Sequence, residues 1–297
     1  MDQARPLLAA VWMFGAMLSF TLMAVAGREL AGHHDTFEIM MYRSILGIAI
    51  VLSIAGAAGT LGQIRLRFLR LHLIRNVFHF TGQNLWFYAI PLIPLAQLFA
   101  LEFTTPLWVA LLAPLVLGET WRATRLAAAG IGFIGILIVA RPGALEIGPG
   151  VITAILAAVG FAGAILTTKI LARHESVTAI LFWLVLTQAV FGLITAGIDG
   201  AIAAPTAFTL PYLAIVGCCG LFSHFCITNA LKLAPASIVS PMEFLRLPLV
   251  AVVGYLLYAE PLDWPVFVGA AVVLFANSLN ILGEQRRQNA PGRVPEV

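Results

Sequence analysis

Pro94–Glu119 reads PLAQLFALEFTTPLWVALLAPLVLGE, and 141 residues further along the chain Pro235–Glu260 reads PASIVSPMEFLRLPLVAVVGYLLYAE. The two stretches align without a gap, so that Glu102 falls on Glu243. Each is an apolar run with one carboxylate in its interior and another at its far end. An apolar run of this length predicts a membrane-spanning segment. A carboxylate inside such a segment is costly to bury, which makes it a candidate functional residue.

The composition of the chain is that of a polytopic membrane protein. Of the 297 residues, 61% are hydrophobic and only 10% are charged, and the mean hydropathy is +0.97. The net charge of +3 comes from arginines in short loops and indicates no nucleic-acid partner. Cys218, Cys219 and Cys226 share one apolar run without metal-ligand spacing, so we expect them to pack as small hydrophobic residues. We expect neither a metal nor another cofactor.

The apolar runs predict an all-α membrane protein with ten transmembrane helices. Most runs are about 20 residues, which at a rise of ~1.5 Å per residue matches a hydrocarbon core about 30 Å thick. The predicted spans are Leu7–Gly27, Phe37–Ala58, Leu71–Pro91, Leu95–Leu117, Thr124–Ala140, Val151–Leu171, Val177–Ile198, Phe208–Leu231, Ser237–Tyr258 and Trp264–Leu282.

The distribution of basic residues predicts the orientation of the chain. With a cytoplasmic N-terminus, thirteen of the seventeen Lys and Arg residues fall in cytoplasmic segments, and only Arg28 and Arg141 fall outside. The other two, Arg43 and Arg246, lie within spans. This asymmetry predicts that both termini are cytoplasmic. We therefore expect a multi-pass membrane protein.

The internal repeat predicts two halves of opposite orientation. Residues 1–141 form the first five-helix repeat, residues 148–283 form the second, and residues 284–297 form a cytoplasmic tail. Because five is odd, the second half enters the membrane from the opposite side, and such inverted repeats place a substrate site near the bilayer midplane. A cleaved signal peptide at Leu7–Ala26 is the less favoured alternative, because the same shift lays this run on an internal apolar stretch.

Two buried carboxylates and two arginines are the charged candidates for a site. Glu102 and Glu243 each lie about 12 Å into the membrane, from opposite faces. Arg43 lies at a similar depth, which predicts a structural ion pair with Glu102, and Arg246 lies within reach of Glu243. Such pairs either lock helices together or bind the charged groups of a zwitterion, and a glutamate can also exchange a proton during transport.

A polar stripe runs along the third span. His72, Asn76, His79, Gln83 and Trp86 recur at intervals of three and four, so they share one helix face, and we expect that face to point into the protein. The last three are the deeper residues and are candidates for a cavity wall. The alternative is that they only pack against neighbouring helices.

Two residues in the second half extend this candidate site. His224 is the repeat counterpart of Gln83, and Trp183 lies away from the ends of the seventh span. Trp86, Trp108 and Trp183 suggest an aromatic wall suited to an amphiphilic metabolite. Aromatic residues in spans also commonly anchor in lipid or pack in the core.

Prolines and small residues indicate bends and close contacts. Pro106, Pro241 and Pro248 lie inside the duplicated spans, where they predict either static kinks or hinges for alternating access. Gly135 in the fifth span and Gly269 in the tenth permit close helix contact. The sequence has no nucleotide-phosphate loop, HExxH motif or serine nucleophile elbow, so we expect no catalytic residues and no enzymatic activity.

The two halves resemble a known transporter family. Each closes its fourth span with an acidic signature, Leu-Gly-Glu at Leu117–Glu119 and Tyr-Ala-Glu at Tyr258–Glu260, followed by a span rich in small residues. In this the chain resembles the EamA-type proteins of the drug/metabolite transporter superfamily, which include bacterial amino-acid exporters. The resemblance implies an inner-membrane carrier with a central cavity lined by the first four spans of each repeat. The segment Met242–Arg246 is also similar to that of relatives that take up vitamins or nucleoside-like cofactors.

These observations lead to one main functional hypothesis and one alternative. The main hypothesis is a secondary transporter that exports amino acids, including aromatic ones, by alternating access. The alternative is an importer of a larger metabolite such as a flavin or adenosine derivative; a membrane enzyme or a passive channel is less favoured. The expected partners are the small-molecule substrate and the lipid bilayer, for a monomer or homodimer. The candidate substrate-binding residues are His79, Gln83, Trp86, Glu102, Trp183, His224, Glu243 and Arg246.

Overall fold

The computed structural model describes residues 6–118, 123–140, 148–198, 200–233, 242 and 245–288, and all regular structure among them is helical. The elements are α1 (Pro6–Leu30), α2 (Thr36–Ala57), the 3-10 helix η1 (Leu61–Gln63), α3 (Leu69–Ala89), α4 (Leu95–Glu102), α5 (Thr105–Leu117), α6 (Ala123–Ala140), α7 (Pro149–Leu171), α8 (Val177–Ala196), α9 (Thr209–Leu233), α11 (Arg246–Tyr258) and α12 (Trp264–Gln288).

The helices are those of a membrane protein. Six spans among the described residues are long and apolar enough to cross a bilayer, and α4 and α5 together form one of them. Shorter apolar stretches lie in α6, α11 and α12. The remaining helix, α3, carries the polar stripe. The protein is therefore an all-helical membrane protein, as the sequence predicted.

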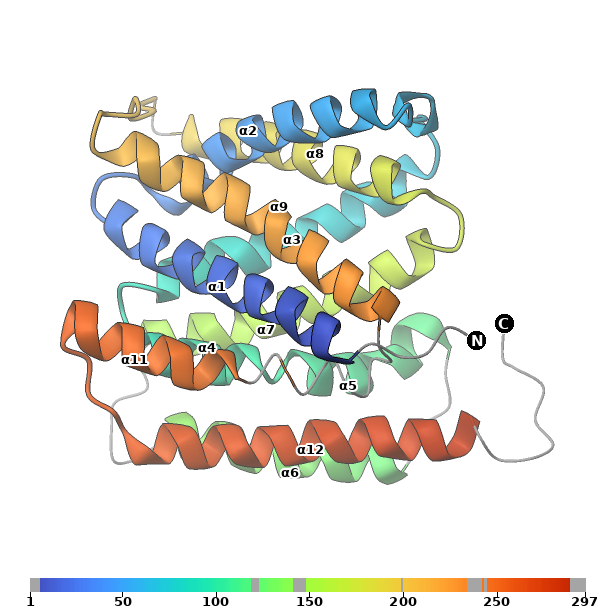
Figure 1. The fold of residues 1–297 in the computed structure, drawn as a ribbon, viewed down its shortest axis with the longest axis vertical. Coiled ribbons are helices and arrows are strands. Elements are labelled where there is room, and N and C mark those ends of the chain that lie inside the picture. The colour runs from blue at the N-terminus through green and yellow to red at the C-terminus, as the bar shows by residue number, and fades with distance from the viewer. Residues whose placement is uncertain are drawn as a thin grey trace.

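Helices from the first half of the chain pack mainly against helices from the second half. The most extensive contacts join α1 with α9, α3 with α7, α6 with α12 and α2 with α8, and α4 contacts α11. In Figure 1, α2 and α8 lie along one edge of the bundle, and α6 and α12 lie along the opposite edge. Exchanging the two halves turns the α1–α9 contact into the α3–α7 contact and leaves the α2–α8 and α6–α12 pairs unchanged. The packing therefore has the pattern expected of a two-fold relation between repeats.

Small residues allow α3 and α7 to cross closely. A Cβ added to Gly160 of α7 would lie 2.9 Å from Cα of Gly82 in α3, so the two backbones nearly touch. The repeat counterparts of these glycines are Ser19 in α1 and Ser223 in α9, and both serines are buried. Each serine hydroxyl donates to a carbonyl of its own helix, which leaves no polar group unpaired at the crossing.

The fifth and tenth spans also meet at glycines. A Cβ on Gly135 of α6 would lie 2.9 Å from the carbonyl oxygen of Gly269 in α12, and the reverse distance is 2.8 Å. The close contact expected from the sequence is therefore formed within one chain, between α6 and α12. Close approach of this kind gains van der Waals contact, which drives helix association in lipid.

The predicted fourth span is broken into two helices. Pro106 has no N–H to donate to the carbonyl of Glu102, and the Thr105 hydroxyl donates to that carbonyl instead, at 2.7 Å. Asn277 Nδ2 of α12 donates to the carbonyl of Phe103 at 3.0 Å. The freed carbonyls are thus satisfied by side chains, which allows a helix break inside a membrane protein.

This break shows where the predicted hinge prolines lie. Pro106 lies in the first turn of α5, where a missing N–H costs nothing. Pro248 lies in the first turn of α11, and Pro241 is outside the described residues. The chain is therefore interrupted close to Glu102 and to Arg246.

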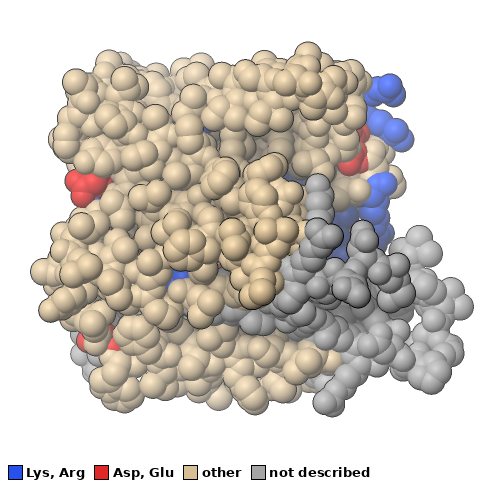
Figure 2. All heavy atoms as spheres, viewed as in Figure 1, with Lys and Arg blue, Asp and Glu red and all other residues tan. Residues whose placement is uncertain are grey.

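The two ends of the bundle differ in charge. We call the end where α1 begins and α12 ends the near end, and the end with the α1–α2 and α8–α9 connections the far end (Figure 1). On the face shown in Figure 2, Lys and Arg gather at the near end, most acidic residues lie at the far end, and the region between is almost uncharged. An uncharged belt between charged ends is what a bilayer requires.

Candidate functional site

A charge pair lies between the end of one helix and the start of another. α4 ends at Glu102 and α11 begins at Arg246. Arg246 Nη2 donates to Glu102 Oε1 at 3.0 Å, and Trp86 Nε1 of α3 donates to Glu102 Oε2 at 2.8 Å. The side chain of Arg246 is 6% exposed and that of Glu102 is 20% exposed. The carboxylate is thus partly accessible and has both oxygens in hydrogen bonds, so it is positioned to contact a bound molecule.

Aromatic rings surround the Arg246 guanidinium. Its Cζ lies 4.5 Å from the ring centroid of Phe99, 4.7 Å from that of Phe20 and 5.0 Å from that of Phe103. Cation–π contacts of this kind stabilise a cation that has lost its water. Nε of Arg246 is buried without a hydrogen-bond partner among the described residues. A small pocket lined by methionines and an alanine of α1, with Phe20, opens onto this arginine.

The predicted partner of Glu102 was wrong. Arg43 was expected to form a structural ion pair with Glu102, and Arg246 to pair with Glu243. In the structure Glu102 pairs with Arg246, because α4 packs against α11 and makes no comparable contact with α2. Glu243 lies outside the described residues.

The polar stripe of α3 faces the protein interior, as the sequence predicted. All five of its residues are buried. Asn76 Nδ2 donates to the carbonyl of Trp183 at 3.0 Å and also to the Thr187 hydroxyl in α8. Nδ1 of His79 lies 2.6 Å from the amide nitrogen of Gln188, also in α8. The stripe therefore joins α3 to α8 through buried hydrogen bonds.

Arg75 belongs to the same helix face. The sequence placed it among the cytoplasmic loop residues, whereas the structure places it in α3 and buries it. Its Nε donates to the Thr168 hydroxyl of α7 at 3.0 Å, and its Nη1 donates to Asn76 Oδ1 at 2.9 Å. The sequence spacing could have predicted its burial, because Arg75 lies one turn before His79 on the polar face of α3.

Arg43 is buried without an oxygen acceptor among the described residues. Its one hydrogen-bond contact there is to the sulfur of Met40, at 3.7 Å. Its guanidinium lies against α9, since a Cβ on Gly220 would be 2.8 Å from Nη2. His224 follows one turn later in α9. His79 is bonded to Gln188 of α8, and α8 packs closely on the same part of α2, since a Cβ on Gly192 would lie 2.8 Å from Cα of Met41. Arg75 lies one turn before His79 in α3. These four basic residues form a cluster, which we call the basic cluster.

His224 connects the basic cluster with the charge pair. The side chain of His224 is exposed. Its ring centroid is 6.2 Å from that of Phe20, whose other contact is the Arg246 guanidinium. Phe20, which the sequence did not single out, therefore lies between the two groups of charged residues.

The remaining predicted residues are dispersed. Gln83 is buried, and its Oε1 has no partner among the described residues. Trp183 is apart from the charge pair, because its Nε1 donates at 3.1 Å to the carbonyl of Arg65 in the connection before α3. The structure thus brings Trp86, Glu102 and Arg246 together, and it joins His79 to α8 through Gln188.

An ion pair joins helices at the far end. Arg28 of α1 pairs with Glu260, and it donates to the carbonyl of Ile90 from Nε at 3.0 Å and to that of Ile93 from Nη2 at 2.7 Å. The other carboxylate oxygen of Glu260 accepts from Leu95 N, at the start of α4, at 2.9 Å. The glutamate of the Tyr-Ala-Glu signature therefore ties α1 and α11 to the α3–α4 turn.

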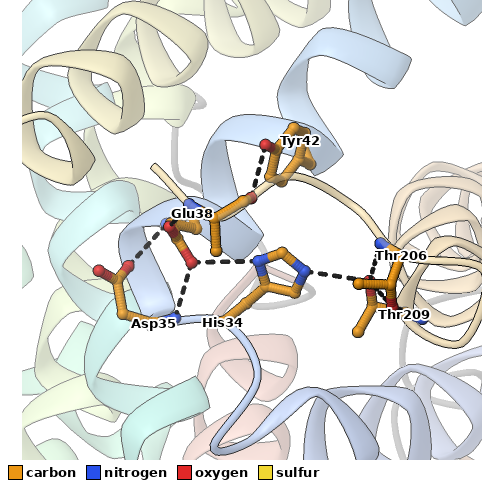
Figure 3. Close-up of polar contacts among 7 residues, drawn as sticks. His34, Asp35, Glu38, Tyr42, Thr206 and Thr209 are labelled. Atoms are coloured by element: carbon orange, nitrogen blue, oxygen red, sulfur yellow. Dashed lines mark hydrogen bonds and ion pairs between the residues drawn. The ribbon is translucent and has the colours of Figure 1, made fainter. Parts of the chain in front are cut away.

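A second polar network joins the two repeats at the far end (Figure 3). Asp35 and Glu38 form a capping box at the start of α2. His34 lies between them and α9, with Nδ1 3.1 Å from Glu38 Oε2 and Nε2 3.1 Å from the hydroxyl of Thr209. Tyr42 donates at 2.8 Å to a backbone carbonyl of the α8–α9 connection. The α1–α2 and α8–α9 connections are thus held together by side chains from both.

Comparison with known proteins identifies relatives along the whole chain. The sequence model of the EamA-like transporter family matches residues 7–141 and 148–282. The chain is 29% identical to a protein named riboflavin transporter from Rhizobium johnstonii, over 98% of this chain and 96% of the relative. It is 23% identical to a protein named S-adenosylmethionine uptake transporter from Rickettsia prowazekii, over 94% of each chain.

The fold also matches a solved structure. A crystal structure superposes with a TM-score of 0.65 at 16% identity, covering 95% of this chain and 99% of that one. At this identity the match concerns the fold alone. Export of amino acids, the main expectation from the sequence, finds no support in the names of the relatives. Uptake of a larger metabolite, the alternative, is the better supported of the two.

Proposed function

Because the chain belongs to the EamA-like transporter family, we propose that it is a secondary transporter that takes up a heteroaromatic metabolite of the flavin or adenosine-derivative class. The observation that carries this proposal is the end-to-end likeness to relatives named for riboflavin and S-adenosylmethionine transport. The matched lengths are nearly equal on both sides, so the likeness extends to all parts of a carrier.

The site geometry supports a flat, partly polar substrate. Trp86 and Phe20 offer aromatic surface beside the charge pair, and Glu102 has a partly exposed carboxylate. Flavin and adenine rings combine an apolar face with a hydrogen-bonding edge, which such a mixture of aromatic and charged groups can bind. In this proposal Glu102 and Arg246 orient the ring system, and Gln83 contributes its unpaired Oε1.

Alternating access requires the far end to open and close. We propose that the Arg28–Glu260 pair and the network of Figure 3 hold the far end closed in this conformation. The basic residues of the near end favour a cytoplasmic location for that end. The helix break between α4 and α5 provides a point at which the fourth span can bend.

Counterflow in liposomes tests the proposal. The purified protein is reconstituted, the liposomes are loaded with unlabelled riboflavin, S-adenosylmethionine or a mixture of amino acids, and uptake of the same labelled compound is followed. We expect saturable counterflow of riboflavin or S-adenosylmethionine. Growth of a riboflavin auxotroph without its own importer, rescued by low external riboflavin, gives a second readout in cells.

Matched variants separate site from scaffold. Glu102→Gln is expected to reduce counterflow strongly, whereas Arg173→Gln, at an exposed position in the α7–α8 connection, is expected to leave it unchanged. Counterflow of amino acids alone would overturn the proposal in favour of amino-acid transport. Absence of counterflow for every compound would remove the substrate class altogether.

A further inference from the structure

We propose that the basic cluster, formed by Arg43, Arg75, His79 and His224, is a subsite for an anionic group of the substrate, a carboxylate or a phosphate. The inference rests on the proposed transport function and adds to it a substrate class. Flavins and adenosine derivatives occur with and without such a group, so the subsite would decide between members of one class.

Arg43 lies well inside the protein and has no counter-charge among the described residues. It is seven residues into α2, about 10 Å from the start of that helix, and its one hydrogen-bond contact among the described residues is the Met40 sulfur. A buried guanidinium without an oxygen partner is costly, and native proteins rarely keep one. The side chain therefore has the donors and the charge for an acceptor that is not part of the described chain.

Arg75 is fixed in position, and one of its nitrogens stays uncommitted. Thr168 and Asn76 accept from Nε and Nη1, and Asn76 is in turn anchored to α8. Among the described residues Nη2 has no such partner. Anchoring of this kind orders the guanidinium before a ligand arrives, which lowers the entropic cost of binding.

The helices around the basic cluster supply almost no acidic residue. α3, α7, α8 and α9 contain neither Asp nor Glu, and α2 contains only Glu38, whose carboxylate is already bonded to His34 and to the backbone at the far end. Two guanidinium groups in one place match the oxygen geometry of carboxylates and phosphates. The chemistry of this region therefore favours an anion over a cation or a neutral sugar.

The position of the basic cluster suits a substrate with two parts. Phe20 lies between His224 and Arg246. A molecule with its ring system against Phe20 and Trp86 would place a carboxylate or phosphate on the His224 side. The His79 ring, held by Gln188, completes the wall of basic groups.

Two pairs of compounds test the subsite, since the members of each differ in one anionic group. Flavin mononucleotide differs from riboflavin by a phosphate, and S-adenosylmethionine differs from its decarboxylated analogue by a carboxylate. Each compound is tested as a competitor of counterflow. We expect the anionic member of at least one pair to bind tenfold or more tightly than the other member of that pair. Arg43→Gln is expected to abolish that preference and to retain transport of the other member. Equal affinities in both pairs, or an equal loss for both members in the variant, would overturn the proposal.

A second measurement tests the anion subsite independently of transport. If none of the four compounds is transported, the proposed function is refuted, but this measurement still tests the subsite. Thermal unfolding is compared in sodium phosphate and sodium chloride at equal ionic strength. We expect phosphate to raise the unfolding temperature of the wild type and of the exposed-site control Arg173→Gln, and this increase to vanish in Arg43→Gln and Arg75→Gln. A persistent increase in both variants would overturn the subsite.

The stability of the variants distinguishes a binding role from a structural one. Without a ligand, Arg43→Gln removes an unpaired buried charge, so we expect its unfolding temperature to equal or exceed that of the wild type. A marked decrease in the unfolding temperature of Arg43→Gln, with no further decrease when Glu243→Gln is added, would identify a structural ion pair and overturn the proposal. His224→Gln provides a milder variant in which loss of the anion preference can be measured with both arginines present.

Discussion

Replacing Glu102 with glutamine tests the central charge pair most directly. The carboxylate accepts from Arg246 Nη2 and from Trp86 Nε1, one donor on each oxygen. A glutamine amide has only one acceptor oxygen, so one of the two donors must lose its partner. The substitution also removes the negative charge opposite a guanidinium that is only 6% exposed.

The expected cost follows from this geometry. At 3.0 Å and an effective dielectric constant of about 20, the Coulomb attraction is roughly 5 kcal/mol. Glu102 is a fifth exposed, so solvent screening removes part of this energy, and the glutamine oxygen still accepts one hydrogen bond. We therefore expect Glu102→Gln to lower the free energy of unfolding by about 1–3 kcal/mol.

A double-mutant cycle isolates the pair. Unfolding in mixed detergent micelles is measured for the wild type, Glu102→Gln, Arg246→Gln and the double variant, with tryptophan fluorescence as the probe. We expect a coupling energy of about 1–3 kcal/mol between the two positions. A coupling energy near zero would refute the argument, because the two side chains would then not interact in the folded state.

Three further predictions concern the scaffold. Gly160→Ala should lower the free energy of unfolding by about 1–3 kcal/mol, because the added Cβ meets backbone atoms of α3. The control Gly130→Ala, whose Cβ would have nothing within 4 Å, should raise the free energy of unfolding by up to ~1 kcal/mol. Equal effects of the two substitutions on unfolding in detergent would contradict the close crossing. Asn277→Ala should cost about 1–3 kcal/mol, since it leaves a carbonyl at the helix break without its donor, and Asn84→Ala, whose amide only back-bonds within α3, should cost less. Glu260→Gln should raise hydrogen exchange at the far-end termini of α1 and α4, and unchanged exchange would show that the ion pair does not close that end.

Several features could be predicted from the sequence because they depend on position along one helix. Apolar runs matched to the bilayer thickness predicted the spans, and the three-to-four spacing predicted which face of α3 is buried. The duplicated acidic stretch predicted a candidate functional carboxylate in both the fourth and the ninth span. These properties follow from hydropathy and helix geometry, which are local.

Other features depend on which helices meet, and only the tertiary structure decides them. The partner of Glu102 is Arg246 and not Arg43, because α4 lies against α11. Arg75, which the count of basic residues assigned to a cytoplasmic segment, is buried in α3, because Thr168 of α7 and Asn76 accept its hydrogen bonds there. The break after Glu102 is possible because Asn277, far along the chain, donates to the carbonyl freed there.

The sequence by itself thus determined the class of protein, its spans and its duplicated half, since transfer of apolar segments into lipid is a property of each segment. The partner of Glu102 was decided by the packing of α4 against α11. The partner of Arg75 in α7 was decided by the close crossing of α3 with α7, where Gly82 and Gly160 let the backbones approach. A shift of one helix turn at such a crossing would change which polar groups meet, and nothing in the local sequence fixes that turn.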